Sequence, residues 1–277
     1  MHHTDGEFMG KNQTRLYFQG WLPEASPKAE VLLVHGLAEH SGRYLNLARQ
    51  IVPEGYAVYG FDLRGHGKSR GLRGYVGRFA DYLYDLKVFV DKLRREHNAT
   101  RLFLLGHSMG ATITLAYLPD HQNEFQGLIL SAPLVRPSVN RSAPIILLSR
   151  TLSLVLPKTG TFRIDAEAIS RDKRVVDAYI NDPLVYRGRI KARLGVEMLK
   201  FMQRAPGEAS QISLPALIVH GTADGLADPA GSEIIYEHLG SKDKTIKLYP
   251  DFYHEVFNDL GQEQVFSELE TWLARHS

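Results

Sequence analysis

The feature that most constrains this chain is a strand-turn-helix pattern near its middle. Leu102 to Leu105 is a short apolar run, typical of a fully buried strand. The next five residues, Gly106 to Gly110, form a G-x-S-x-G turn, and Ala111 to Leu118 has the character of a helix packed on a sheet, with Pro119 helping to end it. The pattern predicts that Ser108 lies in a strained turn, with its hydroxyl exposed at the carboxyl edge of a sheet.

Composition limits the classes of protein to which the chain can belong. Its 277 residues suffice for one large domain or for a domain with an insertion. The formal net charge of +2 is too small to indicate a nucleic-acid partner. There is no cysteine, so disulfides, cysteine metal sites and a cysteine nucleophile are excluded.

Nothing in the sequence has the character of a targeting or membrane-spanning segment. Met1 to Gly20 is polar and lacks the apolar core of a signal peptide. No stretch approaches the roughly 20 apolar residues that a transmembrane helix needs. We therefore expect a cytoplasmic protein, with membrane association left open.

Strand and helix patterns alternate over most of the chain. Strands are expected at Arg15–Trp21, Val31–Val34, Tyr56–Phe61, Leu102–Leu105, Gly127–Ser131, Ala216–Val219 and Thr245–Tyr249. Helices are expected at Tyr44–Ile51, Tyr82–Arg95, Ala111–Leu118, Ser232–Leu239 and Gln264–Arg275. Repeated strand–helix units predict an α/β fold with a mostly parallel sheet and helices on both faces. In such sheets ligands bind beyond the carboxyl ends of the strands.

The alternation stops between residues 134 and 211. This segment holds an apolar stretch, a loop and two helices rich in Lys and Arg, at Ala143–Leu156, Lys158–Thr161, Val175–Tyr179 and Gly188–Met202. We expect 134–211 to be a helical cap inserted into a core made of 1–133 and 212–277. The apolar stretch is interpreted as a buried cap helix, a wall for an acyl chain, or a patch that docks on a membrane or micelle surface.

Three strand ends carry residues that could form a catalytic triad. Ser108 follows one strand, Asp224 follows Ala216–Val219, and His254 follows Thr245–Tyr249. A serine hydroxyl is a weak nucleophile until an imidazole takes its proton, and a carboxylate must orient that imidazole. The order Ser, Asp, His is the order found in α/β-hydrolases. We predict that these three residues act as nucleophile, orienting acid and general base.

Four other residues could take the acid or base role. Asp228 lies further from the strand tip, and Asp251 precedes the proposed histidine by only three residues on one loop. His238 is late in a helix, where a histidine usually has a structural role, and His220 is expected to be a packed loop residue.

Two backbone N–H groups are expected to bind the oxyanion of the reaction. One is the N–H of Met109, directly after the proposed nucleophile. The other comes from the loop after the Val31–Val34 strand, where Leu37 is the predicted donor.

At this level of detail the chain resembles the monoacylglycerol lipases. The segments that match are His35–Tyr44 (HGLAEHSGRY), Asp62–Ser69 (D-x-x-G-H-G-x-S), Gly106–Gly110 (GHSMG), Asn181–Leu184, Gly221–Asp224 and Tyr253–His254. The wider group consists of serine hydrolases of the α/β-hydrolase fold, including lysophospholipases and the serine-aminopeptidase type. The similarity covers nearly the whole chain and is weakest from Pro137 to Val175.

The resemblance implies a serine ester hydrolase that cleaves a monoacylglycerol to fatty acid and glycerol through an acyl-enzyme, without a metal or other cofactor. It implies the triad and oxyanion donors named above. It also implies that Glu39, Arg43 and Tyr179 line the polar end of the site, where glycerol sits. A lysophospholipase or general carboxylesterase is the alternative. A serine aminopeptidase would need an acidic pocket for a free amino terminus, which the sequence does not locate.

Overall fold

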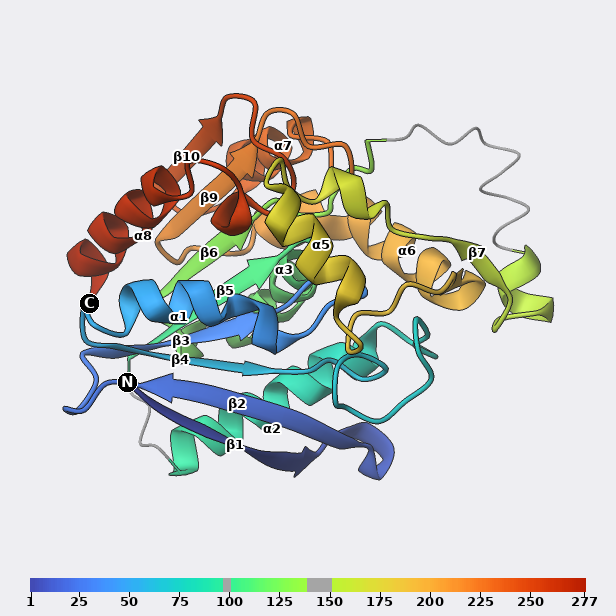
Figure 1. Ribbon diagram of the computed structural model, residues 1–277, viewed down its shortest axis with the longest axis horizontal. Coiled ribbons are helices and arrows are strands. Elements are labelled where there is room, and N and C mark those ends of the chain that lie inside the picture. The colour runs from blue at the N-terminus through green and yellow to red at the C-terminus, as the bar shows by residue number, and fades with distance from the viewer. Residues whose placement is uncertain (97–100, 139–150) are drawn as a thin grey trace.

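The computed structural model describes residues 1–96, 101–138 and 151–277, and within them eight strands form one sheet (Figure 1). In spatial order these are β1 His2–Met9, β2 Arg15–Leu22, β4 Tyr56–Phe61, β3 Ala29–Val34, β5 Leu102–His107, β6 Gly127–Ser131, β9 Ala216–Gly221 and β10 Lys244–Tyr249. The pairs from β4 to β10 are parallel, and β1 and β2 are antiparallel to their neighbours. The predicted α/β-hydrolase architecture is confirmed.

Helices cover both faces of this sheet. One face carries α1 Leu45–Ile51 and α8 Glu263–His276, and the other carries α2 Ala80–Glu96, α3 Met109–His121 and α7 Ala230–His238. Successive side chains of a strand point to opposite faces, so Leu33 packs in the core under α1 and α8, whereas Leu32 packs in the core under α2 and α3. The continuous apolar run predicted for a buried parallel strand arises in this way.

The strand expected at Arg15–Trp21 is present as β2, but a strand before it was not predicted. Strand β1 precedes it and pairs along its whole length with β2, from His2 opposite Leu22 to Met9 opposite Arg15. This edge strand buries only Phe8. An edge strand with one buried side chain lacks the apolar alternation by which strands are recognised.

The bounds of α3 also differ from the prediction. The helix continues through Pro119 to His121 before a short turn of 3₁₀ helix at Gln122–Glu124. Proline lacks the N–H that a helix interior needs, but Pro119 lies only two residues from the last helical residue, so the helix does end close to it.

The segment between β6 and β9 contains α5 Lys173–Asn181 and α6 Ala192–Ala209, with a two-stranded antiparallel sheet of β7 Gly160–Phe162 and β8 Ile190–Lys191. The prediction of a loop at Lys158–Thr161 and of a helix from Gly188 was therefore wrong in detail. Strands of two or three residues are too short to show a period in the sequence. Residues 143–150 of the predicted apolar stretch lie outside the described residues.

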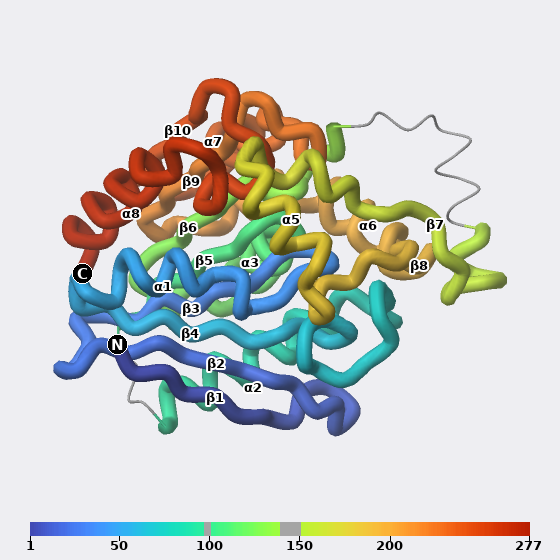
Figure 2. Tube along the Cα trace, in the orientation of Figure 1, coloured from blue at the N-terminus to red at the C-terminus, as the bar shows by residue number. Residues whose placement is uncertain are grey.

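These inserted elements lie over the carboxyl ends of the parallel strands, and α6 packs on α3 and α7 (Figure 2). Three contacts tie the insert to core loops. The Tyr186 N–H donates to Ala38 O at 2.8 Å, the Glu255 N–H donates to Ile169 O at 2.8 Å, and His40 Nε2 lies 2.8 Å from Asp182 Oδ2. The insert therefore rests on two of the loops that follow strands of the sheet.

Four further 3₁₀ helices lie at Lys11–Gln13, Ser41–Tyr44, Ala166–Ala168 and Val256–Asn258. Within the described part of the chain, no helix is both long enough and apolar enough to span a bilayer.

Candidate active site

Ser108 lies in the sharp turn between β5 and α3, with φ 53° and ψ −117°. This left-handed backbone is strained for a residue with a side chain. The turn is possible because of the two flanking glycines. A Cβ on Gly106 would lie 2.6 Å from Ala111 Cα, and one on Gly110 would lie 2.0 Å from Val34 O. Any larger residue at either position would push strand and helix apart.

Hydrogen bonds on both sides hold this strained residue in place. The Ser108 N–H donates to Ser131 O at 2.9 Å, and its carbonyl accepts from Thr112 N and Leu134 N, each at 3.2 Å. The neighbouring strand β6, the helix and the start of the insert thus jointly determine where the hydroxyl lies.

Asp224 and His254 form a buried pair beside this turn. Asp224 follows β9, His254 follows β10, and His254 Nδ1 lies 2.6 Å from Asp224 Oδ2. The other carboxylate oxygen, Oδ1, accepts from the N–H groups of Leu226 at 2.7 Å and Ala227 at 3.0 Å. These two donors fix the plane of the carboxylate, so His254 meets it in one orientation.

The electrostatics of this pair suit proton transfer. Burial raises the pKa of Asp224, but the charge of His254 and hydrogen bonds from His220 and His254 outweigh burial and hold that pKa well below its usual range. Burial lowers the pKa of His254, but the charge and hydrogen bond of Asp224 overcome this, with Glu255 and Glu39 adding, so its net pKa is raised. His254 thus sits in surroundings that stabilise its protonated form.

Two more histidines surround the pair. The His107 ring is 4.8 Å from the His254 ring, its Nδ1 lies 3.1 Å from Ser131 Oγ, and burial lowers its pKa well below the usual value. His220 was expected in a loop, but it belongs to strand β9 and its Nε2 lies 2.9 Å from Asp224 Oδ2. The sequence shows that His220 lies four residues before Asp224, but it does not show that the His220 ring points at the Asp224 carboxylate.

The alternatives for the acid and base lie elsewhere. Asp228 pairs with Arg136 at 2.9 Å and accepts from the Ala230 N–H at the start of α7. Asp251 is exposed on a turn with φ 64°. His238 bonds through Nδ1 to the Ile234 carbonyl one helical turn back.

The backbone of the loop after β3 is stabilised by a side chain of the same loop. The Gly36 N–H donates to Glu39 Oε1 at 2.6 Å, and Ala38 adopts φ 69°. Leu37, between them, lines the same cavity as Ser108. Met109 is the first residue of α3, where backbone N–H groups have no acceptor within the helix.

Glu39, Arg43 and Glu255 form a buried cluster that the sequence analysis recognised only in part. Arg43 Nη1 lies 3.0 Å from Glu39 Oε2 and 2.5 Å from Glu255 Oε1, while its Nη2 lies 2.7 Å from Glu255 Oε2. The Tyr179 ring covers the guanidinium at 4.8 Å. Burial lowers the pKa of Arg43, but the two carboxylates outweigh it and the net pKa is raised. Glu255 directly follows His254, which was the available sequence signal.

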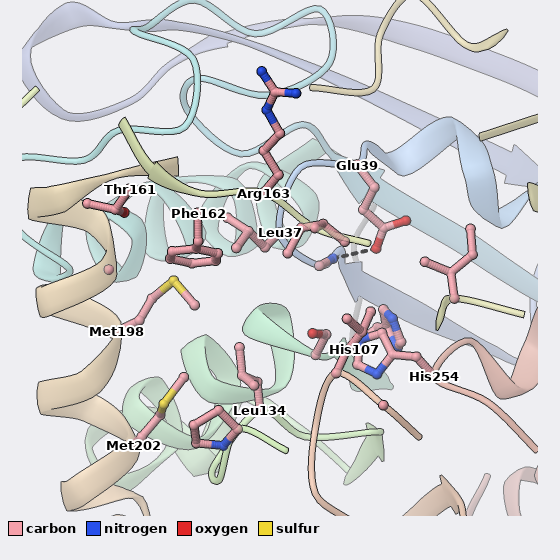
Figure 3. Close-up of a pocket in the computed structure, with 18 of the residues that line it drawn as sticks. Leu37, Glu39, His107, Leu134, Thr161, Phe162, Arg163, Met198, Met202 and His254 are labelled. Carbon is pink, nitrogen blue, oxygen red and sulfur yellow. Dashed lines mark hydrogen bonds between the residues drawn. The ribbon is translucent and has the colours of Figure 1, made fainter. Parts of the chain in front are cut away.

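The cavity next to Ser108 has a volume of about 220 Å³ (Figure 3). Its polar end is formed by Glu39, His107 and His254, and Tyr179 and Glu255 also line it. Apolar side chains from the segment between β6 and β9 form the other end, among them Leu134, Phe162, Met198 and Met202. Arg43 is not among the lining residues and lies behind the two carboxylates.

Such a cavity suits an amphipathic ligand with its reactive bond near the serine. Among the residues that the structure describes, no group of three or more histidine, aspartate or glutamate side chains is arranged to hold a metal ion.

The sheet topology, the strained serine after β5 and the Asp–His pair at the ends of β9 and β10 are those of an α/β-hydrolase. Residues 25–261 match the family model described as serine aminopeptidase, S33, and the chain belongs to this family.

Its relatives narrow the class further. The monoacylglycerol lipase of Mycolicibacterium smegmatis is 33% identical over 273 residues, covering 99% of this chain and 98% of that protein. The human monoglyceride lipase is 34% identical over 99% of this chain and 89% of its own length. The crystal structure of Paleococcus ferrophilus monoacylglycerol lipase superposes with a TM-score of 0.84 at 33% identity, covering both chains fully. The protein is thus a monoacylglycerol lipase-like carboxylic ester hydrolase.

Proposed function

We propose that this enzyme hydrolyses monoacylglycerols to fatty acid and glycerol with Ser108, His254 and Asp224 as its catalytic triad. The observation that carries the proposal is the 2.6 Å contact between His254 and Asp224 on a cavity that Ser108 also lines. The cavity is polar at the serine and apolar beyond it, as an acyl glycerol requires. The relatives named monoacylglycerol lipase support this substrate class.

The proposed reaction follows from this arrangement. His254 takes the proton of Ser108, whose oxygen attacks the acyl carbonyl, and the backbone N–H groups of Leu37 and Met109 bind the oxyanion. His254 then gives its proton to the departing glycerol oxygen, leaving the acyl group on Ser108. A water molecule, deprotonated by His254, attacks the acyl-enzyme, and His254 returns the proton to Ser108 Oγ as the ester bond breaks and the fatty acid leaves. Asp224 stabilises the imidazolium formed in each half-reaction.

We propose the same division of the chain that the sequence suggested, with 134–211 as the cap and 1–133 plus 212–277 as the core. Strand β6 pairs directly with β9, Leu128 opposite Ala216, although the insert lies between them in sequence. A core that continues across an insertion in this way does not need the insert to complete its sheet.

For the head group, we propose that Glu39 and Tyr179 contact glycerol and that Arg43 acts by holding Glu39 and Glu255 in place. Arg43→Ala would leave both buried carboxylates without their cation. We expect KM for a monoacylglycerol to rise by about tenfold or more, and KM for a nitrophenyl ester of equal chain length to rise less. Steady-state kinetics with both esters measure this difference.

The control for Arg43 is Arg43→Lys, which keeps the charge but loses the bidentate contact with Glu255. We expect it to fall between wild type and Arg43→Ala. Equal increases in KM for both esters would remove Arg43 from head-group recognition.

One observation favours a second candidate, an aminopeptidase. Glu39 and Glu255 are two carboxylates on the wall of the cavity, and an amino terminus could bind such groups. However, Arg43 already pairs with both of them. The ester hydrolase therefore remains our proposal.

We also propose a transient contact between the cap and a membrane or micelle surface. Leu154, Val155 and Leu156 are 73%, 72% and 55% exposed. Three adjacent exposed apolar side chains are costly in water and gain by entering a lipid interface. Co-sedimentation with phosphatidylcholine vesicles, compared with a variant carrying serine at these three positions, measures the contribution.

The proposed function is tested by a panel of substrates of equal acyl length assayed side by side. We expect fatty acid to be released fastest from monoacylglycerol, more slowly from di- and triacylglycerol and from lysophospholipid, and no product from a proline amide. Faster turnover of the lysophospholipid or the amide than of monoacylglycerol would contradict the proposal.

A further inference from the structure

A second imidazole shares the carboxylate oxygen that holds the proposed catalytic histidine. Asp224 Oδ2 lies 2.6 Å from His254 Nδ1 and 2.9 Å from His220 Nε2. On its other side His220 Nδ1 lies 2.7 Å from Ser232 Oγ. His220 and Ser232 are both fully buried. A continuous chain of side chains thus runs from Ser232 in α7 through His220 and Asp224 to His254.

The contacts of His220 determine which ring nitrogen carries a proton. Nε2 faces two acceptors, Asp224 Oδ2 and, at 3.2 Å, the Ala227 carbonyl oxygen. It must therefore be an N–H donor to both. Nδ1 faces only the Ser232 hydroxyl, which can donate to a neutral ring or accept from a charged one. His220 is oriented so that it donates to Asp224 in either charge state.

This donation affects the reaction through the carboxylate. Each hydrogen bond that Asp224 accepts stabilises its ionised form and makes it a weaker partner for the imidazolium of His254. Oδ2 is thus held by two rings, while the N–H groups of Leu226 and Ala227 hold Oδ1. The orientation of the carboxylate and its basicity toward His254 therefore both depend on His220.

We propose that His220 is a positioning residue of the esterase, which holds Asp224 in line with His254 and limits how strongly that carboxylate binds the proton of His254. The inference rests on the proposed triad. His220 does not line the cavity, so it acts on the reaction mainly through Asp224.

Other polar groups lie around His254 and must stay constant in the test. They are the His107 ring at 4.8 Å, Glu39 from the loop after β3, Glu255 from the loop after β10, and Arg43, which pairs with these two carboxylates. None of these four contacts His220 through a hydrogen bond or ion pair within the described residues. Replacing His220 therefore changes the field at His254 mainly through Asp224.

The test is the pH dependence of kcat/KM for a nitrophenyl ester, which does not depend on the natural head group. The acid limb reports the pKa of the free-enzyme base, which must be neutral to act. His220→Leu removes one hydrogen bond from Asp224, so His254 holds its proton more strongly and the limb should move up by about half a pH unit or more. We expect the plateau of kcat to fall about tenfold with KM little changed.

A conservative variant distinguishes a positioning role of His220 from a role in folding. His220→Gln keeps an N–H that can reach Asp224, so we expect both the limb and the plateau to return toward wild type. Ser232→Ala loses only the far end of the chain and should shift the limb in the same direction by a smaller amount. This variant keeps the inference testable if His220→Leu does not fold.

A matched control is His276→Leu, which removes another histidine that pairs with an aspartate, Asp243, but is half-buried and lies on α8 away from the cavity. Its pH profile should equal that of wild type. An unmoved acid limb in His220→Leu or, if that variant does not fold, in Ser232→Ala would overturn the inference, as would equal damage by Leu and Gln. If Asp224→Asn were also fully active, the proposed triad itself would fail.

Discussion

Ser108→Ala is expected to abolish ester hydrolysis and labelling by a fluorophosphonate probe, while the protein stays folded. Ser108 has φ 53° and lies in a sharp turn that is possible only because Gly106 and Gly110 lack a Cβ. It lines the same cavity as His254. Loss of the nucleophile removes the acyl-enzyme pathway, and a loss of about 10⁶ in turnover is the scale seen for other serine hydrolases. Fatty-acid release and gel-based labelling measure the two effects.

The matched control for this experiment is Ser210→Ala, an exposed serine whose hydroxyl bonds to the Gly207 carbonyl. It should keep both activity and labelling. Circular dichroism and thermal melting check that the Ser108 variant is folded. Persistent labelling of Ser108→Ala would mean that another residue is the nucleophile.

Asp224→Asn is expected to lower kcat by about 10⁴. The N–H groups of Leu226 and Ala227 point at Oδ1, so they select the amide oxygen for that position. The amide NH₂ then takes the place of Oδ2 and faces His254 Nδ1. It forces the proton of His254 onto Nε2, the nitrogen that must accept the proton of Ser108. The base is thereby held in the wrong tautomer, with little change in shape.

The rival carboxylates provide the controls for this variant. Asp228→Asn and Asp251→Asn should keep activity within a few fold of wild type, since one pairs with Arg136 and the other is exposed on a turn. Kinetics at several pH values distinguish a variant in which His254 no longer acts as a base from one in which only the pKa of His254 has changed. A loss under tenfold in Asp224→Asn, with a large loss in either rival, would reassign the orienting acid.

Where interactions are local, the sequence predicted the structure well. The run Leu102–Leu105, the glycines around Ser108 and the helix after them are neighbours along the chain, so their pattern alone indicated the turn. The strand ends that carry Asp224 and His254 were identified in the same way. Parallel strands bring their carboxyl ends to one edge, which is why residues 30 apart, such as these two, were expected to meet.

Predictions failed where an element gains its stability from a distant partner. β1 buries one apolar side chain and depends on pairing with β2, while β7 and β8 are too short to show a period. The resemblance assigned Arg43 to the head-group end, which stays a prediction, but its pairing with Glu39 and Glu255 was not predicted. Its two partners lie 4 and 212 residues away, and although Glu255 directly follows His254, no pattern in the sequence pairs Glu255 with Arg43.

The sequence by itself determined the fold class, the chain order of the proposed nucleophile, acid and base, and the glycines without which the serine turn could not form. Only the tertiary structure decided that His220 shares the oxygen of Asp224 and that Glu255 neutralises Arg43. The physical reason is how far apart along the chain the interacting residues lie. Backbone conformation follows from residues a few positions apart, whereas the direction of a buried side chain depends on which donors and acceptors the packed chain brings within about 3 Å of it.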